Sequence, residues 1–448
     1  MALLSGGGRP LRVVPAREPE AVAEAIARRL LSDGPAVLPA ADPAAETAFA
    51  QRLAEGGGLP EELALVVSTS GSTAAPKRVA LSAGALRAAA EASGAELDRR
   101  VAASLSQFEL TGPRGLATVQ GPEAWQWVLC LPAHYIAGAQ VLVRAALGGG
   151  RAVVAATERF RPRALVDAYE ELDAPCLAVS LVPAQLQRLL AAAEASPRQA
   201  ERYGVEAEEL REVMAAFDAI LVGGQALPRS VRERAERLDW QLIATYGASE
   251  TAGGCVYDGA PLPGVELRVE DGELLVAAPQ LASGYAGDPE RSASAFPEID
   301  GRRWYRTGDA GLLEPDPTVP GGTRLRVTGR LDDVIVSGGE KVPLGGLEAR
   351  LRELRGFEEL VVAPCPSEQW GRVPVAVLAS PAVEAGGAVP AGPDDPALLR
   401  LRQAAGELGR AFRPAALLRV RELPRLPGGK PDRVAIAALA ARVFAAAK

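Results

Sequence analysis

The sequence of 448 residues contains one histidine, four cysteines and few aromatic residues, which make up 4% of the chain. With His134 as the sole histidine, a histidine-based zinc site or a Ser-His-Asp triad is hard to build. Cys130, Cys176, Cys255 and Cys365 stand singly, without metal-ligand spacing and too sparsely for a disulfide framework. Metal centres of histidine and cysteine, and histidine-dependent hydrolysis, are therefore disfavoured.

An excess of basic charge and long apolar runs are also missing. Acidic residues outnumber basic ones, 56 to 49, and the net charge is −7, whereas a dedicated nucleic-acid binder is normally basic. No apolar run reaches the ~20 residues of a membrane span. No long apolar stretch follows a basic start at the N-terminus, so we expect neither a signal peptide nor membrane insertion. A cytoplasmic enzyme that holds small anionic ligands at local sites fits this composition.

The hydrophobic content of 48% predicts a large buried core, and the length allows two or three domains. Short apolar runs alternate with helical sequence, and most of them end in a polar or glycine-rich loop. These runs are Leu63–Val67, Ala152–Ala155, Cys176–Val179, Ala219–Val222 and Gln241–Thr245. The alternation predicts a largely parallel, buried sheet that binds ligands beyond the carboxyl ends of its strands.

After residue 260 the pattern becomes β-rich, and an Asp-Gly turn joins the predicted hairpin strands Val265–Glu270 and Glu273–Ala277. The polar, glycine-rich segment Gly329–Asp333 marks a domain boundary. We therefore predict an α/β fold with two parts. Residues 1–329 form a large N-terminal domain of stacked βα-type sheets plus a β-rich subdomain, and residues 330–448 form a small, mobile α+β C-terminal domain.

The strongest local motif, residues 68–77, reads Ser-Thr-Ser-Gly-Ser-Thr-Ala-Ala-Pro-Lys and follows a predicted strand. Its hydroxyls and backbone offer donors to phosphate oxygens, and Lys77 adds a positive charge. The candidate phosphate-binding residues are Ser70, Gly71, Ser72 and Thr73. Because Arg78 follows Lys77 where a Walker A loop has Ser or Thr, a P-loop kinase is disfavoured. A plain surface turn remains open on composition alone.

This loop resembles the phosphate loop of the adenylate-forming superfamily, which comprises acyl-CoA synthetases, peptide-synthetase adenylation domains and luciferases. Ala74 stands where that family usually has glycine, which should stiffen the loop. Further family motifs follow in the family's order. They are Gly223–Pro228, Tyr246–Glu250, Trp304–Asp309, Gly329–Asp333 and Leu426–Lys430. Their number and order argue against a chance match, which a single short motif could not do.

The resemblance implies a role for each matching residue. The residues expected around ATP are Gly223, Gly224, Gln225, Tyr246, Gly247, Ser249, Asp309 and Arg330. In family usage the adenine lies on the glycines and the aromatic ring, and the aspartate accepts from the ribose hydroxyls. Glu250 would hold Mg²⁺, a hard ion that favours oxygen ligands, and Asp332 would be the pivot of the small domain. Lys77 and Lys430 would offset the repulsion between a carboxylate and the phosphates of ATP.

Two half-reactions follow from the resemblance. A carboxylic acid attacks ATP to form an acyl-AMP with release of pyrophosphate, and the thiol of coenzyme A then attacks this mixed anhydride. Rotation of the small domain would separate the two steps, which share one site. ATP, Mg²⁺ and coenzyme A are therefore expected. The protein needs no nucleophile of its own, which agrees with the scarcity of histidine.

Three segments resemble the o-succinylbenzoate–CoA ligases of menaquinone biosynthesis: Leu131–Gly138, Ser180–Leu186 and Gly253–Gly259. The residues expected at the acyl group are His134, Ser180, Gln185, Arg188, Gly253 and Gly254. We expect His134 to gate or contact the acyl group, while the glycine pair leaves room for a flat ring. Arg188 could meet the second carboxylate of an aromatic dicarboxylic acid, although a solvated helix face is the more ordinary explanation.

The predicted function is an AMP-forming o-succinylbenzoate–CoA ligase. A ligase for another aryl acid and a stand-alone adenylation enzyme that loads a carrier protein share the ATP residues and remain alternatives. A non-catalytic adenylate-binding protein is disfavoured because Lys77, Glu250, Asp309, Arg330 and Lys430 are all retained. The sequence leaves the oligomeric state open, a homodimer included.

Overall fold

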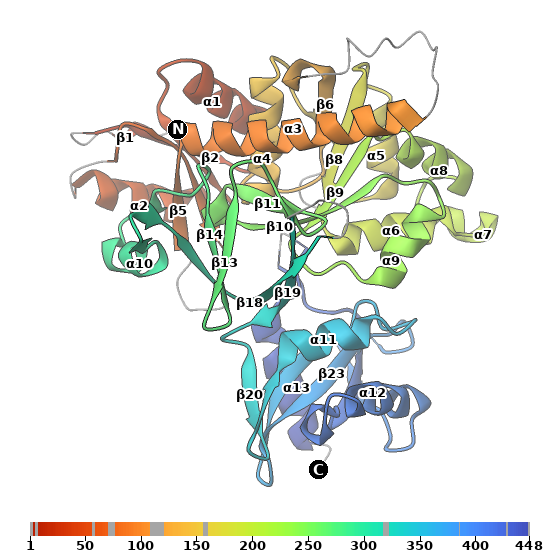
Figure 1. Ribbon diagram of the computed structural model, residues 1–448. Coiled ribbons are helices and arrows are strands. Elements are labelled where there is room, and N and C mark those ends of the chain that lie inside the picture. Colours follow the sequence, from red (N-terminus) through yellow and green to blue (C-terminus); the bar gives the residue numbers. More distant parts are fainter. Residues whose placement is uncertain are drawn as a thin grey trace.

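The computed structural model is a mixed α/β protein of two bodies (Figure 1). It describes residues 3–4, 8–55, 59–69, 77–107, 121–155, 160–316, 322–384, 386–426 and 429–446. The large body holds the elements up to β19 (Thr323–Arg330), and the small body holds β20 (Val334–Ser337) and all later elements (Figure 1). This arrangement confirms the predicted fold class. Among the described residues, no helix is long and apolar enough to cross a membrane.

A six-stranded mixed sheet forms one side of the large body. In spatial order its strands are β1 (Leu3–Leu4), β2 (Leu11–Pro15), β3 (Ala36–Ala40), β4 (Leu63–Thr69), β5 (Lys77–Ser82) and β15 (Gly284–Tyr285). Strands β2 to β4 run parallel, but β5 is antiparallel to both β4 and β15. The connection from Ser70 to Pro76 explains this reversal, because a parallel crossover needs about a dozen residues or more. The run Leu63–Val67, expected in the parallel sheet, lies here instead.

Helices cover both faces of this mixed sheet. They are α1 (Pro19–Leu31), α2 (Pro43–Glu55) and α3 (Ala83–Gln107). Val22, Ile26 and Leu30 recur at helical spacing, and in α1 they enter the main core, which also contains residues of α3 and α4 (Ile136–Leu147). Phe49 of α2 packs in a separate cluster on the other face of the sheet.

A seven-stranded sheet, largely parallel as predicted, forms the centre of the large body. In spatial order its strands are β12 (Ala260–Pro261), β11 (Gly253–Tyr257), β10 (Leu242–Ala248), β9 (Ala219–Gly223), β8 (Cys176–Leu181), β6 (Trp125–Leu129) and β7 (Val153–Val154). Only β11 and β12 are antiparallel to their neighbours. Helices α5 (Pro162–Tyr169), α6 (Pro183–Ala193), α7 (Pro197–Ala200), α8 (Ala207–Ala215) and α9 (Arg229–Glu236) follow these strands in the chain.

The carboxyl ends of β8, β9 and β10 lie side by side at one edge of this sheet. Leu181 is paired with Val222, and Gly223 with Thr245. The strands are buried until they reach this edge, where Gly223 becomes partly exposed. Ligands in open α/β sheets bind at this kind of edge, so the loops that follow these strands are the place to look for a site.

A four-stranded antiparallel sheet supplies the β-rich part of the large body. Its order is β13 (Glu266–Glu270), β14 (Glu273–Ala277), β18 (Tyr305–Pro315) and β19. The predicted hairpin is confirmed as β13 and β14, and both Asp271 and Gly272 have positive φ at its turn. Between β14 and β18 lie β15, α10 (Pro289–Ala295) and the small hairpin β16 (Glu298–Ile299) and β17 (Arg302–Arg303).

The small body has a sheet and cores of its own. Its sheet comprises β21 (Glu340–Pro343), β20, β23 (Gly371–Ala379), β25 (Ala416–Val420) and β24 (Ala388–Pro390), with β22 (Val361–Ser367) also paired to β23. Its helices are α11 (Leu344–Arg352), α12 (Pro396–Gly406) and α13 (Arg433–Ala446). Leu347 and Leu401 belong to one buried cluster, and Val375 and Ile436 to another, both formed within this body. The exact residue at which one domain ends, placed at 329 by the sequence, stays a prediction.

Candidate active site

Two glycines at the carboxyl end of β9 permit close packing. A Cβ atom on Gly223 would lie 2.4 Å from Thr245 Oγ1, and one on Gly224 would lie 2.9 Å from Lys430 Cε. Gly224 also has a φ of +85°, which favours glycine. The next residue, Gln225, has a side-chain Nε2 without a hydrogen-bond partner among the described residues. Gly223 thus admits the side chain of Thr245, and Gly224 admits the side chain of Lys430, which comes from the small body.

A hydrogen-bonded group joins β10, β18 and β19 beside this edge. The Tyr246 hydroxyl donates to Asp309 Oδ2 at 2.6 Å, and Arg330 Nη1 donates to Asp309 Oδ1 at 3.1 Å and to the Thr307 carbonyl at 3.0 Å. Asp309 and Arg330 are opposite each other in the antiparallel pair of β18 and β19. Partial burial raises the pKa of Asp309, while the hydrogen bond from Tyr246 and the charge of Arg330 act in the opposite direction.

A second group surrounds Glu250, in the short 3-10 turn η3 (Ser249–Thr251) that follows β10. Glu250 is only 5% exposed, and its Oε1 accepts a hydrogen bond of 2.8 Å from the Tyr285 hydroxyl. The ammonium of Lys77 lies 5.4 Å from the centroid of the same tyrosine ring. Burial and the Glu250 charge raise the pKa of Tyr285, so its hydroxyl stays protonated and can donate.

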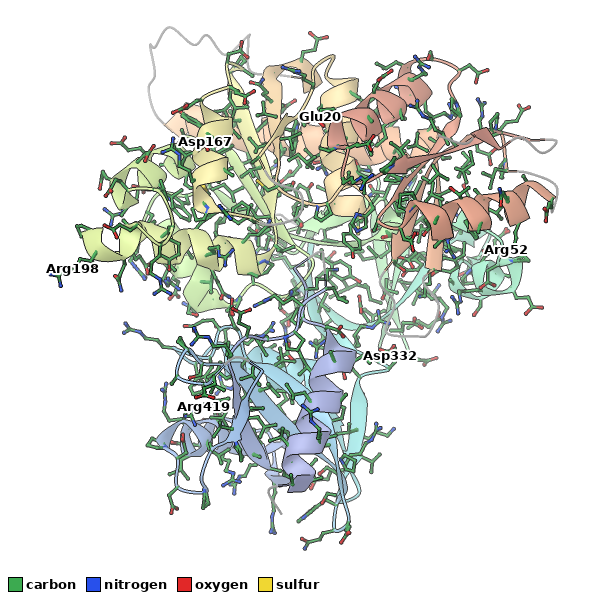
Figure 2. All side chains as sticks on the ribbon, turned by 180° about the vertical axis from the view of Figure 1, so that it is seen from behind. Glu20, Arg52, Asp167, Arg198, Asp332 and Arg419 are labelled. Atoms are coloured by element: carbon green, nitrogen blue, oxygen red, sulfur yellow. The ribbon has the colours of Figure 1, made fainter. Side chains whose placement is uncertain are left out.

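Lys430 extends from the loop before α13 toward both groups. Its side chain is accessible to solvent, but protein surrounds it closely, and this desolvation lowers its pKa while the charges of Asp309 and Glu250 partly oppose the shift. Figure 2 shows Asp332 at the junction of the two bodies. Arg330 Nε donates to Asp332 Oδ1 at 3.0 Å. Residues of both bodies therefore meet at one site.

The donor groups of this site are compatible with Mg²⁺. The described residues contain no group of three or more His, Cys, Asp and Glu side chains that could hold a metal ion. Glu250 provides a single buried carboxylate, with one oxygen already engaged by Tyr285. Mg²⁺ typically uses one or two carboxylates and completes its shell with waters and substrate phosphates. This donor set thus fits Mg²⁺ bound together with a nucleotide.

Two of the expected acyl residues, His134 and Gly253, lie close to the start of α4. His134 is half-buried, its ring centroid is 4.1 Å from that of Tyr135, and neither ring nitrogen has a hydrogen-bond partner among the described residues. Burial lowers the pKa of His134. A Cβ atom on Gly253 would lie 3.3 Å from Gln140 Cγ of α4. Ser180 is buried near the carboxyl end of β8.

The glycines of β10 and β11 are required by contact between these strands. Gly247 is paired with Gly254, and a Cβ atom on Gly247 would lie 2.0 Å from the Gly253 carbonyl oxygen. A Cβ atom on Gly254 would lie 2.9 Å from Tyr257 Cε1. These glycines allow the loop that carries Glu250 to fold tightly against β11.

Two of the predicted acyl residues are engaged with backbone atoms. Gln185 accepts from Val182 N at 3.0 Å and donates to the Cys130 carbonyl at 2.7 Å, so it caps α6. Arg188 Nη1 donates to the Phe160 carbonyl at 2.8 Å. Contact of either side chain with an acid stays a prediction.

The predicted phosphate-loop residues Ser70, Gly71, Ser72 and Thr73, together with Ala74, lie outside the described residues.

Tyr285 was not among the residues predicted from the sequence. It belongs to β15, a strand of two residues, which is too short for a periodic pattern. The pairing of Tyr285 with Val79, close to Lys77, could have indicated its place only if the order of strands had been known.

The fold and this two-body site define the class of the protein. The model of the AMP-binding enzyme family matches residues 12–286, which is more than half of the chain. The chain therefore belongs to the family of AMP-binding enzymes, and the resemblance to adenylate-forming enzymes is confirmed.

Within this family the chain is similar to 2-succinylbenzoate–CoA ligases. It is 32% identical over 384 residues to the probable 2-succinylbenzoate–CoA ligase of Mycobacterium tuberculosis, covering 85% of each chain. Bacillus subtilis o-succinylbenzoate CoA synthetase, solved with the acyl-adenylate intermediate OSB-AMP, superposes with a TM-score of 0.58 at 23% identity, covering 83% of this chain and 68% of the other. ATP-bound MatB of Rhodopseudomonas palustris has a TM-score of 0.66 at 19% identity, with coverage of 99% and 90%.

Proposed function

We propose that the protein is an ATP-dependent acid–CoA ligase whose acid is 2-succinylbenzoate. One observation carries the catalytic part of this proposal: the small body places Lys430 against Gly224, near the charges of Asp309 and Glu250. The choice of acid is supported by the similarity to the mycobacterial ligase over most of both chains.

In the first half-reaction a carboxylate oxygen attacks the α-phosphorus of ATP, and the bond to pyrophosphate breaks. Tyr246, Asp309 and Arg330 would hold the nucleoside, since they form a fixed hydrogen-bonded group next to Gly223 and Gly224. Both reactants are anionic, so Lys430 and Lys77 would lower the barrier by offsetting their repulsion and the charge that develops on pyrophosphate.

Glu250 would hold Mg²⁺, which when bound would neutralise charge on the phosphates of ATP. The protein's own part is to keep this carboxylate buried within the site. Phosphate oxygens would also receive donors from the segment Ser70–Thr73, which ends four residues before Lys77 in the sequence. Binding the acid and ATP side by side would lower the barrier further, because the attack becomes effectively unimolecular.

In the second half-reaction the sulfur of coenzyme A attacks the acyl carbonyl, and AMP leaves. Lys430 is not needed for this step, because no further charge must be neutralised at the α-phosphorus. We infer that the part of the chain after Asp332 turns about this residue, which withdraws Lys430 and admits the thiol.

The acid would lie between the start of α4 and the tip of β11. His134, whose two ring nitrogens have no hydrogen-bond partner in the described part of the chain, would contact or gate the acyl group, and Gly253 and Gly254 would flank the aromatic ring. Ser180 and Arg188 would approach from the β8–α6 segment. We also propose a cytoplasmic location, because ATP and coenzyme A are available there.

Acid-dependent pyrophosphate release in the presence of ATP, Mg²⁺ and coenzyme A tests this proposal, with 2-succinylbenzoate, benzoate and a long-chain fatty acid as candidate substrates. Of the three acids, we expect only 2-succinylbenzoate to cause release of pyrophosphate, and we expect its CoA thioester to form. Pyrophosphate release with another acid would support the proposed type of reaction but contradict 2-succinylbenzoate as the substrate. Pyrophosphate release without thioester formation would indicate a carrier-protein acceptor, and the absence of release with every acid would contradict the proposed function.

A further inference from the structure

The carboxylate of Glu250 has an unusual partner for a buried charge. The Tyr285 hydroxyl, 2.8 Å from Oε1, is the only hydrogen-bond donor that the described part of the chain offers to this carboxylate. No arginine or lysine of the described residues forms an ion pair with it. Glu250 and Tyr285 are 5% and 6% exposed, so water has little room to replace the hydroxyl. A buried carboxylate needs such a partner because an unpaired charge is costly.

The surroundings of Tyr285 fix where its hydroxyl points. Its strand pairs antiparallel with β5, with Tyr285 opposite Val79. Its backbone N–H donates to Ser292 Oγ at 2.8 Å, and its ring centroid lies 5.9 Å from that of Phe296. Backbone and ring are thus both constrained, so the hydroxyl is held ready for the carboxylate before any ligand binds.

The same ring also faces the ammonium of Lys77, 5.4 Å from its centroid. Lys77 is the first residue of β5, directly after the predicted phosphate loop. A lysine and a glutamate at one site would ordinarily pair, which would leave neither free for its ligand. The tyrosine contacts both groups through different parts of its side chain, the hydroxyl for Glu250 and the ring face for Lys77.

We propose that Tyr285 is a positioning residue: it orients the Glu250 carboxylate for the metal ion of the metal–nucleotide complex and keeps Lys77 available for phosphate. This inference rests on the proposed function, because the metal–nucleotide complex belongs to it. It adds a role for a residue whose hydroxyl contacts the carboxylate of Glu250.

Equilibrium binding of Mn²⁺, followed by the electron paramagnetic resonance signal of the free ion, tests the proposal without turnover. The samples contain the full chain and a non-hydrolysable ATP analogue. Tyr285→Phe keeps the ring, its packing and the contact with Lys77, and removes only the hydroxyl. We expect it to weaken Mn²⁺ binding about tenfold, the lower end of what loss of a group that orients a metal ligand costs.

A double-mutant cycle with Glu250→Gln shows whether the hydroxyl acts through the carboxylate. If it does, Tyr285→Phe has no further effect on Mn²⁺ binding once Glu250 is an amide. Additive losses would overturn the proposal, because they would mean that the hydroxyl acts on the metal independently of Glu250.

Ser292→Ala is the matched control, since it removes a support of the Tyr285 backbone and leaves the hydroxyl in place. Equal weakening of Mn²⁺ binding by Ser292→Ala and Tyr285→Phe would show a merely structural role and overturn the proposal. If Glu250→Gln weakens binding and Tyr285→Phe does not, the positioning role alone fails. If Glu250→Gln also leaves Mn²⁺ binding unchanged, the metal role of Glu250 in the proposed function fails with it.

Discussion

Asp309 and Lys430 lie at the same site but are held in opposite ways. Both oxygens of Asp309 are engaged, one by Tyr246 and one by Arg330, and all three residues belong to strands of the large body. The Lys430 side chain forms no hydrogen bond or ion pair with any described residue and is placed by packing against Gly224. The contrast teaches that the group around Asp309, which we propose holds the nucleotide, is built in advance, whereas the lysine can leave without breaking a strong bond.

The loop that carries Lys430 is itself well defined within the small body. Its backbone is closed by a hydrogen bond of 2.8 Å from Leu426 N to the Lys430 carbonyl, and Arg433 donates to the buried Glu348 at 2.8 Å. Lys430 therefore moves with the small body as a unit. A fixed half and a movable half suit a reaction whose two steps share one nucleotide site but need the lysine only once.

Replacing Lys430 should have the largest effect, and it should be confined to one step. We expect Lys430→Ala to slow adenylation about 100- to 1000-fold, the usual cost of removing one charge-stabilising donor. Thioester formation from supplied acyl-AMP should stay near the wild-type rate. Separate assays of pyrophosphate exchange and of thioester formation check this division.

Arg442→Ala is the control for this variant, because Arg442 is an exposed cation on α13 that has no contact with the site. It should leave both half-reactions unchanged. Equal loss of both half-reactions in Lys430→Ala would contradict the division between a fixed and a movable half.

Asp309→Asn should impair both steps, because the ribose is present in ATP and in acyl-AMP. Loss of hydrogen bonds to a charged group costs about 1.5–3 kcal/mol, which corresponds to a loss of affinity of about 10- to 100-fold. We expect this loss for ATP and for a stable acyl-AMP analogue alike, measured by calorimetry. A loss for ATP alone would place Asp309 with the phosphates of the first step, and the comparison with Lys430 would fail.

The pH dependence of adenylation should also separate the two halves. Desolvation lowers the pKa of Lys430 below the ordinary lysine value of 10.5, and the protonated form is the active one. The kcat/KM of adenylation, which reports the free enzyme, should therefore fall as pH rises through a midpoint below 10.5, by about tenfold per pH unit beyond it.

Lys430→Arg tests whether Lys430 causes this alkaline decline, because a guanidinium stays protonated throughout the range. Whatever activity remains in this variant should show no alkaline decline. Thioester formation from acyl-AMP should lack the decline in the wild type as well. A decline that persists in the arginine variant would assign it to another group.

The sequence predicted the fixed half of the site better than its connections. The strands β8, β9 and β10 were predicted because buried parallel strands are apolar along their whole length and end at polar loops. The antiparallel direction of β5 was not predicted, since it depends on the short connection from Ser70 to Pro76. Gln185 shows a further limit, because its partner, the Cys130 carbonyl, is 55 residues away in the chain.

The approach of Lys430 to Gly224 could be expected only from the family resemblance. Composition and periodicity place the lysine in a loop before a helix, but they say nothing about the angle between two bodies joined at Asp332. No sequence pattern indicated Tyr285, because its strand has only two residues. Its place in the site depends on the pairing of this strand with β5, which is distant in the chain.

The smallest effect is expected at a polar contact between the two bodies. The backbone N–H of Arg229, at the start of α9, donates to both carboxylate oxygens of Glu353 in the small body, at 3.2 and 3.1 Å. An exposed carboxylate at a helix N-terminus contributes about 0.3–1 kcal/mol, a factor of about two to five. Glu353→Gln should therefore slow adenylation by that factor, because less of the protein has Lys430 in place.

The same substitution should leave thioester formation unchanged or make it faster, because the contact has to break before the small body turns. Glu407→Gln is the control: Glu407 pairs with Arg350 within the small body and lies outside this contact. Single-turnover rates of both half-reactions at low and high salt provide the measurement, and salt should reduce the wild-type advantage because it screens exposed charges. Slowing of both half-reactions by Glu353→Gln would mean that the contact stabilises the fold and not this arrangement of the two bodies.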